Sequence, residues 1–480
     1  MDICKFKAKY FDYDENQPSN FECLEESISN GLCIFHNKEN ADHQKTLEKF
    51  NEKIKKCSTN KPLFCIGYNL PPSKIQKNFS KPVYFTKSTF SDPDFSECNF
   101  QYADFSGSKL QNANFSKSSF KGADFLGVEF NGPTNFSNTS FKEKVNFSES
   151  NFNEANFSNS KLLRAHFLGT AFKKADFSLS EIEESDFFKT IFSGNVNFIG
   201  AKIKKSKFQN TQFQGSTNFT GAILYKLNFP QSKFKSVDFD QATLDIVSLR
   251  HSTFDGKANF SSSELKKLDL FKVVFANDAI FFEADLNEVV FPETIFNGYT
   301  NFKKAKFSDE IKFDKTEFQK VDFSDGKFEG KTFFTNVIFN DQKNVFFDVE
   351  NLGSVSFRNT SIINVNFGEN VKWGGKSGFE IIDEEFLNES TKKAILESVI
   401  ATYRNLRKNY ELKFRYEEAK KFLEREVQLK KKYSGGIVSD NDLLEAKLNE
   451  LSFEIDELKK GLNILKKMIN NEKENNKLQK

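Results

Sequence analysis

The sequence has little methionine, tryptophan and histidine, and its positive and negative charges nearly cancel. Its 480 residues include two Met, one Trp and four His, while 69 Lys and Arg oppose 67 Asp and Glu for a net charge of +2. A near-neutral chain lacks the electrostatic footprint of a generic nucleic-acid binder and that of an acidic mimic of nucleic acid. We therefore expect no nucleic-acid partner.

Long apolar runs are missing too. Met1–Lys5 show no basic segment leading into an apolar one, so no signal peptide is expected. No run approaches the roughly 20 apolar residues that a helix needs to cross a bilayer. These absences predict a cytoplasmic protein without a transmembrane segment.

Sequence signatures of catalysis are equally scarce. His166 precedes Phe167, and His251 follows Leu249 by two positions, so neither has a nucleophile or a carboxylate reserved for it in a recognisable constellation. The sequence also lacks a phosphate-binding glycine loop and the metalloprotease and serine-hydrolase motifs. We predict that the protein is not an enzyme.

The residue that is abundant is phenylalanine, with 60 copies. Large apolar residues recur at every fifth position, first at Phe95, Phe100, Phe105, Leu110, Phe115, Phe120, Phe125 and Phe130. A small residue usually stands two positions before each, and Asn or Asp one position before. A period of five matches neither a helix nor a flat strand. It predicts a chain that turns a corner every five residues, with the large and small residues pointing inward.

The repeat continues to about Phe367, which makes roughly fifty repeats and, at four per coil, a rod of roughly 60 Å. At several corners the step lengthens to six residues, and glycine recurs there: Gly132, Gly194, Gly215, Gly256 and Gly298. We expect these glycines to provide positive φ angles. Several lie 21 residues apart and so form a ridge along one face, which is either a recognition surface or a corner variant that only shapes the coil. Six-residue steps at Phe141–Phe147 and Phe307–Phe313 fall on the opposite face.

The pattern A-(D/N)-F/L-x-x resembles the pentapeptide-repeat family over about residues 79–370. The resemblance implies an all-β solenoid, a right-handed quadrilateral β-helix. The open strand edges of such a rod need caps. We therefore expect a cap at residues 1–78, the β-helix at 79–370, a helical cap at 371–437 and a coiled-coil tail at 438–480.

The N-terminal segment holds five of the six cysteines. Cys33 and His36 form a C-x-x-H element, and we predict that they bind one structural Zn together with Cys4 and Cys23, with Cys57 and Cys65 as possible substitutes. The alternative is a set of buried structural thiols with a hydrogen-bonded histidine.

Helical signals take over after Trp373. From Glu384 to about Lys432, apolar residues recur at spacings of three and four, and the segment resembles a helix-turn-helix repeat of the tetratricopeptide kind. The simplest interpretation is a helical cap on the last coil.

The tail carries a heptad seam formed by Leu444, Leu448, Leu451, Ile455, Leu458, Leu462, Leu465 and Ile469. Alternating steps of four and three predict a coiled coil, and an apolar stripe of this length needs a partner. The partner is either a second copy, which would make the protein a homo-oligomer, or the preceding helix, reached by a hairpin through Ser434-Gly435-Gly436.

These features favour a non-enzymatic scaffold, a rigid rod that contacts an as yet unknown protein partner and associates through its tail. The alternative, known in some pentapeptide-repeat proteins, is a mimic of duplex DNA that binds and protects topoisomerases. That role requires a strongly acidic rod, whereas residues 91–370 carry only a slight acidic excess.

Overall fold

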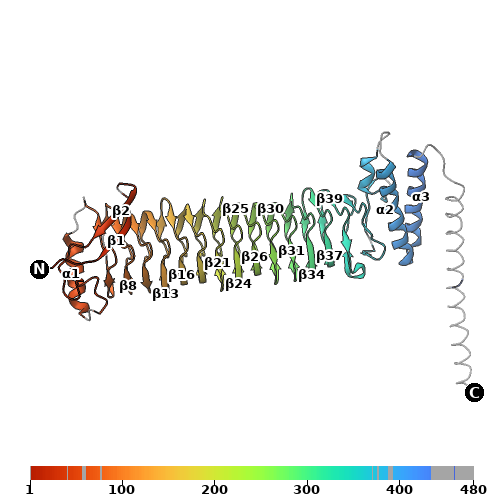
Figure 1. The fold of residues 1–480 in the computed structure, drawn as a ribbon. Coiled ribbons are helices and arrows are strands. Elements are labelled where there is room, and N and C mark those ends of the chain that lie inside the picture. Colours follow the sequence, from red (N-terminus) through yellow and green to blue (C-terminus); the bar gives the residue numbers. More distant parts are fainter. Residues whose placement is uncertain are drawn as a thin grey trace, which may run out of the picture.

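The computed structural model describes residues 2–13, 15–39, 42–56, 61–75, 78–369, 371–375, 378–387, 393–433 and 459. The chain forms a long rod, with a small region that includes α1 (His43–Lys56) at one end and the helices α2 (Lys393–Leu412) and α3 (Tyr416–Tyr433) at the other (Figure 1). The rod is a β-solenoid of about 14 turns, which confirms the predicted fold class.

Two long parallel sheets run along the rod, and each coil contributes strands to both. The first sheet consists of β3 (Leu63–Phe64), β6 (Asn78–Phe79), β7 (Val83–Tyr84), β10 (Asn99–Asp104), β12 (Ser119–Asp124), β14 (Ser140–Phe141), β15 (Val145–Asn146), β17 (Lys161–Leu163), β18 (Ala165–His166), β20 (Glu181–Glu183), β23 (Lys202–Lys204), β25 (Ile223–Asn228), β27 (Thr243–Ser248), β30 (Glu264–Asp269), β33 (Asp285–Asn287), β35 (Lys306–Phe307) and β38 (Lys327–Phe328).

The second sheet consists of β4 (Asn69–Leu70), β8 (Thr89–Ser91), β11 (Lys109–Gln111), β13 (Glu129–Asn135), β16 (Asn151–Asn156), β19 (Ala171–Asp176), β21 (Ile191–Phe192), β22 (Val196–Asn197), β24 (Gln212–Asn218), β26 (Lys233–Asp238), β28 (Thr253–Phe254), β29 (Ala258–Asn259), β31 (Val274–Phe275), β32 (Ala279–Ile280), β34 (Ile295–Asn301), β37 (Glu317–Asp322), β40 (Ile338–Phe339), β41 (Val345–Phe347) and β43 (Asn366–Phe367). Shorter parallel pairings join β5 (Ser73–Lys74) to β9 (Pro93–Asp94), and β36 (Ile311–Lys312), β39 (Thr332–Phe333) and β42 (Val355–Ser356) to one another.

Parallel pairing begins earlier along the chain than residue 79. Leu63 in β3 pairs with Val83 in β7, and Leu70 in β4 pairs with Phe90 in β8. The inward sites of this first coil hold residues such as Leu63 and Leu70 in place of phenylalanine, so the five-residue phenylalanine pattern does not reveal it.

The interior of the rod consists of side-chain ladders, in which each inward ring stacks on the equivalent ring one coil away. All eight large residues from Phe95 to Phe130 named above are at most 2% exposed. In the ladder that runs from Phe95 through Phe115 and Phe136 to Phe157, successive ring centroids lie 4.8–5.1 Å apart. One site shape repeated along the axis therefore accounts for the large number of phenylalanines.

The Asn or Asp before each inward residue has a local role. Asn114 Oδ1 accepts a hydrogen bond from the backbone N–H of Ser116 at 3.1 Å, and Asp124 Oδ1 accepts one from Leu126 at 2.9 Å. Each side chain thus closes the turn that starts the next side of the coil. These carboxylates and amides are thus part of the turn structure of the repeat.

The six-residue steps are β-bulges or strand breaks, but the expectation of positive φ at their glycines is mostly wrong. Gly132 has φ +82°, whereas Gly215 does not lie in the positive-φ region. A Cβ at Gly215 would lie 2.3 Å from the backbone carbon of Gly194 in the neighbouring coil. Close approach between the bulged corners of successive coils is therefore what requires glycine there.

The C-terminal edge of the coil is covered by helix α2. Asn409 Nδ2 lies 2.8–2.9 Å from the carbonyl oxygens of Ile362, Ile363 and Val365. Arg415, in the turn between α2 and α3, donates to the carbonyl oxygens of Gly368 and Glu369, each at 2.9 Å. The backbone groups that would otherwise end the sheet are thus satisfied by side chains.

Replacement of Asn409 by alanine is expected to destabilise this end by about 1–3 kcal/mol, because buried carbonyl groups lose their donor. The measurement is hydrogen exchange of residues 352–373 together with chemical denaturation. Asn405→Ala is the matched control, since Asn405 lies one turn earlier on α2 and its Nδ2 is 3.5 Å from the oxygen of Thr360. Equal effects at the two positions would contradict the assigned role of Asn409.

The heptad seam from Leu444 to Ile469 lies outside the described residues. Among the helices that the structure does describe, none combines the length and the apolar character that a membrane span requires.

Candidate metal centre

The first candidate ligands are brought together by an antiparallel hairpin. Strands β1 (Lys7–Asp12) and β2 (Gln17–Glu22) pair with Lys7 opposite Glu22. Cys4 precedes β1 and Cys23 follows β2, so both lie at the open end of the hairpin. The backbone N–H of Cys4 donates to the oxygen of Glu25 at 2.9 Å, which continues the pairing beyond the strands.

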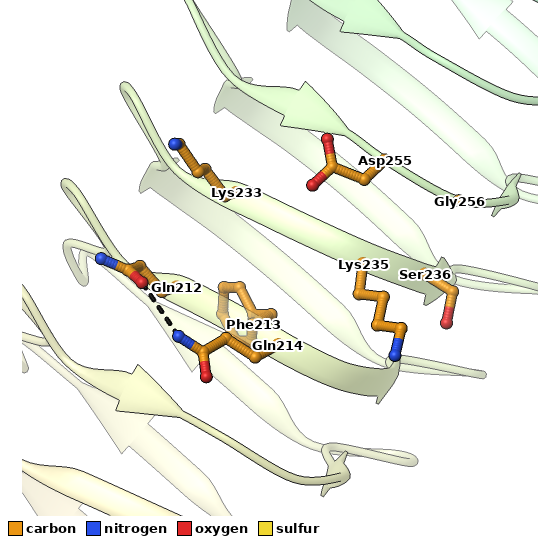
Figure 2. Close-up of a pocket in the computed structure, with 8 residues that line it drawn as sticks. All are labelled: Gln212, Phe213, Gln214, Lys233, Lys235, Ser236, Asp255 and Gly256. Atoms are coloured by element: carbon orange, nitrogen blue, oxygen red, sulfur yellow. Dashed lines mark hydrogen bonds between the residues drawn. The ribbon is translucent and has the colours of Figure 1, made fainter.

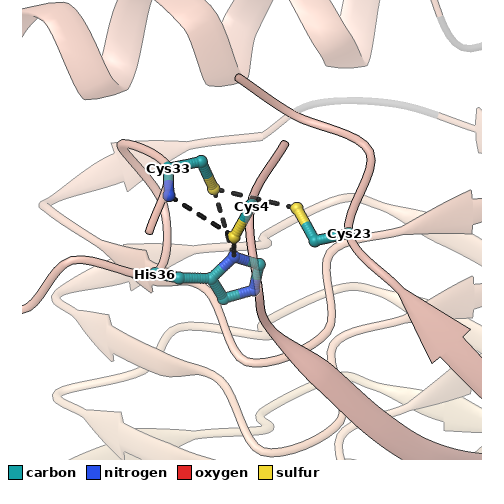
Figure 3. Close-up of side chains that lie close together, drawn as sticks. All are labelled: Cys4, Cys23, Cys33 and His36. Carbon is teal, nitrogen blue, oxygen red and sulfur yellow. Dashed lines mark hydrogen bonds between the residues drawn. The ribbon is translucent and has the colours of Figure 1, made fainter. Parts of the chain in front are cut away.

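The loop after the hairpin adds the remaining two ligands. The N–H groups of His36 and Asn37 both donate to the oxygen of Cys33, at 3.1 and 3.0 Å, and this tight turn places the Cys33 and His36 side chains on the same side. Figure 3 shows the four side chains of Cys4, Cys23, Cys33 and His36 converging on one point. The set is the one that the sequence predicted.

The distances within the cluster are near those of tetrahedral zinc coordination. The four ligand atoms all lie within 4.8 Å of one another. His36 Nδ1 is 3.1 Å from Cys33 Sγ and 3.3 Å from Cys4 Sγ, and the Sγ atoms of Cys23 and Cys33 are 3.8 Å apart. Ligands at about 2.0–2.3 Å from a tetrahedral zinc ion are separated by roughly 3.3–3.8 Å. The cluster could therefore hold a metal ion after small shifts of these side chains.

The tautomer of His36 also suits a metal ligand. Its Nε2 lies 2.9 Å from the carbonyl oxygen of Ile66. A carbonyl oxygen can only accept a hydrogen bond, so Nε2 carries the proton and Nδ1 presents a lone pair to the three sulfur atoms. An outer hydrogen bond of this kind is the usual way in which a protein orients a metal-binding histidine.

The thiols are electrostatically coupled. The hydrogen bond with Cys23 lowers the pKa of Cys33 far below the ordinary thiol value, while the same hydrogen bond and burial raise the pKa of Cys23. Of these two thiols, Cys33 is the one that loses its proton more readily, and thiolate is the form that binds metals.

Burial distinguishes this centre from a catalytic one. Cys4, Cys23, Cys33 and His36 are at most 6% exposed. Four protein ligands closed off from solvent leave no position for a substrate or a water molecule, which is typical of structural zinc sites.

Aromatic side chains pack between the candidate metal centre and the first coil. The Phe6 ring stacks on His36 with centroids 3.9 Å apart, and a Cβ at Gly67 would lie 2.2 Å from Phe6 Cζ. Phe35 stacks on Tyr68 with centroids 4.3 Å apart. No sequence motif marks Phe6, Gly67 or the Ile66 carbonyl as part of this centre, because only the folded chain brings them beside the cysteines.

The other candidate residues lie elsewhere. Cys65 is buried in the first coil and is not part of the cluster, and Cys57 lies outside the described residues. His166 is half-buried in β18, and His251 is exposed with its ring 5.3 Å from Phe271. Within the described part of the chain, the four-residue cluster is the one group with a metal-binding arrangement of Cys, His, Asp and Glu.

Charges on the rod surface pair with charges one coil away. Lys161 contacts Glu181 at 3.2 Å, and Lys205 lies 3.3 Å from Glu183. The basic run at residues 202–207 therefore lies beside the acidic run at residues 181–186 and does not form an isolated basic patch. Each exposed pair adds little stability, but together the pairs leave no long surface of one sign in this part of the rod.

The hollows described on the rod surface are open to solvent. One of them has a volume of about 570 Å³ and lies over β24, β26 and the turn after β28, where Figure 2 shows its polar lining side chains on the outer face of the coil. Its polar lining residues Gln212, Gln214, Lys233, Lys235 and Asp255 are exposed. The hollow lacks the buried, convergent polar groups of an enzyme site.

Part of the rod matches a known family model. Residues 78–119 and 115–161 match the family model for pentapeptide repeats (9 copies). Similar solved structures include HetL, a pentapeptide repeat protein involved in heterocyst differentiation regulation from the cyanobacterium Nostoc sp. strain PCC 7120. HetL is 14% identical, the match covers 61% of this chain and 97% of HetL, and the TM-score is 0.19. Another is QnrB1, a plasmid-mediated fluoroquinolone resistance protein. It is 14% identical, the match covers 49% of this chain and 96% of QnrB1, and the TM-score is 0.18. No curated protein matches the sequence.

Proposed function

We propose that this chain, whose residues 78–161 match the pentapeptide-repeat family model, is a non-enzymatic scaffold whose rigid rod contacts other proteins and whose tail drives self-association. The observation that supports the proposal most is how the polar groups of the rod are used. Asn and Asp side chains close turns, outward charges pair between coils, and the interior is filled by stacked rings. The part of the rod that is left to contact other proteins is its long, regular outer surface, and solenoids bind partners through such surfaces.

The alternative role, a mimic of duplex DNA that protects topoisomerases, is less well supported. Such a mimic needs a continuous acidic face, because duplex DNA carries one negative charge per roughly 1.7 Å of axis. Between residues 161 and 207 the rod instead alternates basic, acidic and basic coils.

Self-association through the tail has a direct test. Light scattering is expected to give at least twice the monomer mass for the full chain and the monomer mass for a version that ends at Tyr433, the last residue of α3. Ile455→Asp, at a seam position, should act like the truncation, whereas Lys460→Asp, between seam positions, should leave the mass unchanged. A monomeric full chain would contradict self-association and favour the hairpin through Ser434-Gly435-Gly436.

For the metal centre we propose one structural Zn bound by Cys4, Cys23, Cys33 and His36. Three thiol ligands and one imidazole favour Zn²⁺ over hard cations such as Mg²⁺ or Ca²⁺, and a reducing cytoplasm would keep the thiols available. Elemental analysis of protein purified without added metal is expected to give one zinc per chain. Protein that contains no zinc and takes up none from solution would contradict this proposal.

A further inference from the structure

The N-terminal edge of the coil has backbone groups that no preceding coil can satisfy. In the first coil, the N–H groups of Leu63 and Cys65 donate to Pro82 and Tyr84 of the second coil, at 3.0 and 2.9 Å. The N–H of Asn69 and the carbonyl of Ile66 instead bond toward the N-terminal cap. Left uncovered, such an edge can pair with another strand edge.

These two groups are covered by the segment that also carries two of the candidate metal ligands. The carbonyl oxygen of Phe35 accepts the Asn69 N–H at 2.8 Å, and His36 Nε2 donates to Ile66 at 2.9 Å. The turn from Cys33 to His36 therefore has two roles. It holds half of the metal cluster, and it closes the edge of the first coil.

The opposite end of the rod is closed without a metal. There Asn409 and Arg415 cover the last coil with side-chain hydrogen bonds from helix α2 and the turn that follows it. Removal of a metal from the N-terminal cap would thus expose one edge and leave the other covered.

We propose that metal occupancy of the cap controls access to the N-terminal edge, and that the metal-free edge pairs with the same edge of a second copy. This inference rests on the proposed structural zinc. Two identical edges that face each other are related by a two-fold axis, so their strands run antiparallel and the contact is self-complementary. Because the far end of the rod stays covered, a chain that is not linked through its tail has one free edge, and its association stops at one added copy.

The experiment measures the mass of the full-length chain with the seam substitution Ile455→Asp, which removes assembly through the tail, by light scattering in three states: as purified, after zinc removal with a chelator, and after zinc is returned. The mass of the metal-free protein is expected to be twice that of the zinc-bound protein, and to return to the starting value with zinc. The variants below are made in the same Ile455→Asp background, because a tail-linked dimer has two edges and would grow beyond a doubling. Hydrogen exchange at residues 66–69 should become faster in metal-free protein kept too dilute to associate.

A variant at the edge itself separates this mechanism from general loss of structure. Asn69→Pro removes the N–H that faces the cap, and this N–H makes no bond to the second coil. The variant should still bind one zinc but should keep its mass when the metal is removed. Asn112→Ala, on the outer surface well inside the rod, serves as the matched control and should double its mass like the unmodified protein.

The possible outcomes are distinguishable. Zinc that is present and removable with no change in mass would overturn the edge mechanism and leave the structural zinc intact. Growth into large aggregates, or doubling that Asn69→Pro does not prevent, would also overturn it. Absence of zinc from all samples, with no uptake, would overturn the structural zinc itself and this inference with it.

Discussion

Cys33→Ser is expected to abolish zinc binding and to make the N-terminal cap unfold at a lower temperature than the rod. In small zinc domains the bound metal contributes on the order of 10 kcal/mol to folding at neutral pH, and a hydroxyl is a poor replacement for a thiolate ligand. Calorimetry should then show a separate early transition for the cap, and elemental analysis should show no bound zinc.

The control for this prediction is a buried cysteine that is not a ligand. Cys98 Sγ donates to the carbonyl oxygen of Ile75 at 2.7 Å, and Ser108 and Ser118, at equivalent sites, make the same bond to Phe85 and Phe95 at 2.6 Å. Cys98→Ser should therefore keep both the metal and the single transition. Retention of zinc and of normal cap stability in Cys33→Ser would show that Cys33 is not a ligand.

Phe115→Ala is expected to cost about 3–5 kcal/mol, because it removes a ring from the middle of a ladder and leaves a cavity. The Phe115 ring lies 5.1 Å from Phe95 and 4.8 Å from Phe136, centroid to centroid, and it is fully buried. In a solenoid each coil contacts only its neighbours, so the loss should be concentrated in the adjacent coils. Chemical denaturation measures its size, and hydrogen exchange measures its location.

Lys117→Ala, two positions later, is the matched control. Lys117 is exposed, and its one ion pair, with Glu97 at 3.4 Å, lies on the surface. Its replacement should change stability by less than about 0.5 kcal/mol. Equal costs for the two substitutions would contradict the assignment of inward and outward positions.

The sequence alone was sufficient for the parts of this protein that depend on local repetition. A five-residue period in large apolar residues has few structural solutions, so the all-β coil and the inward position of residues such as Phe95 and Leu110 could be predicted without coordinates. The candidate ligands could be named for a related reason, since a C-x-x-H element constrains its own geometry and few other thiols were available.

Only the tertiary structure decided what depends on contacts between distant residues. Cys4 and Cys23 join Cys33 because the pairing of β1 with β2 brings their ends together, and Cys65 is kept apart because it occupies an inward site of the first coil. The hydrogen bonds that Asn69 donates to the Phe35 oxygen and His36 donates to the Ile66 oxygen likewise link positions about 30 residues apart. Gly215 is required by the backbone of the neighbouring coil, and the charges of residues 181–207 cancel between coils. The repeat determines each coil, but spacing along the chain does not reveal what lies across from a residue in the next coil or in the cap.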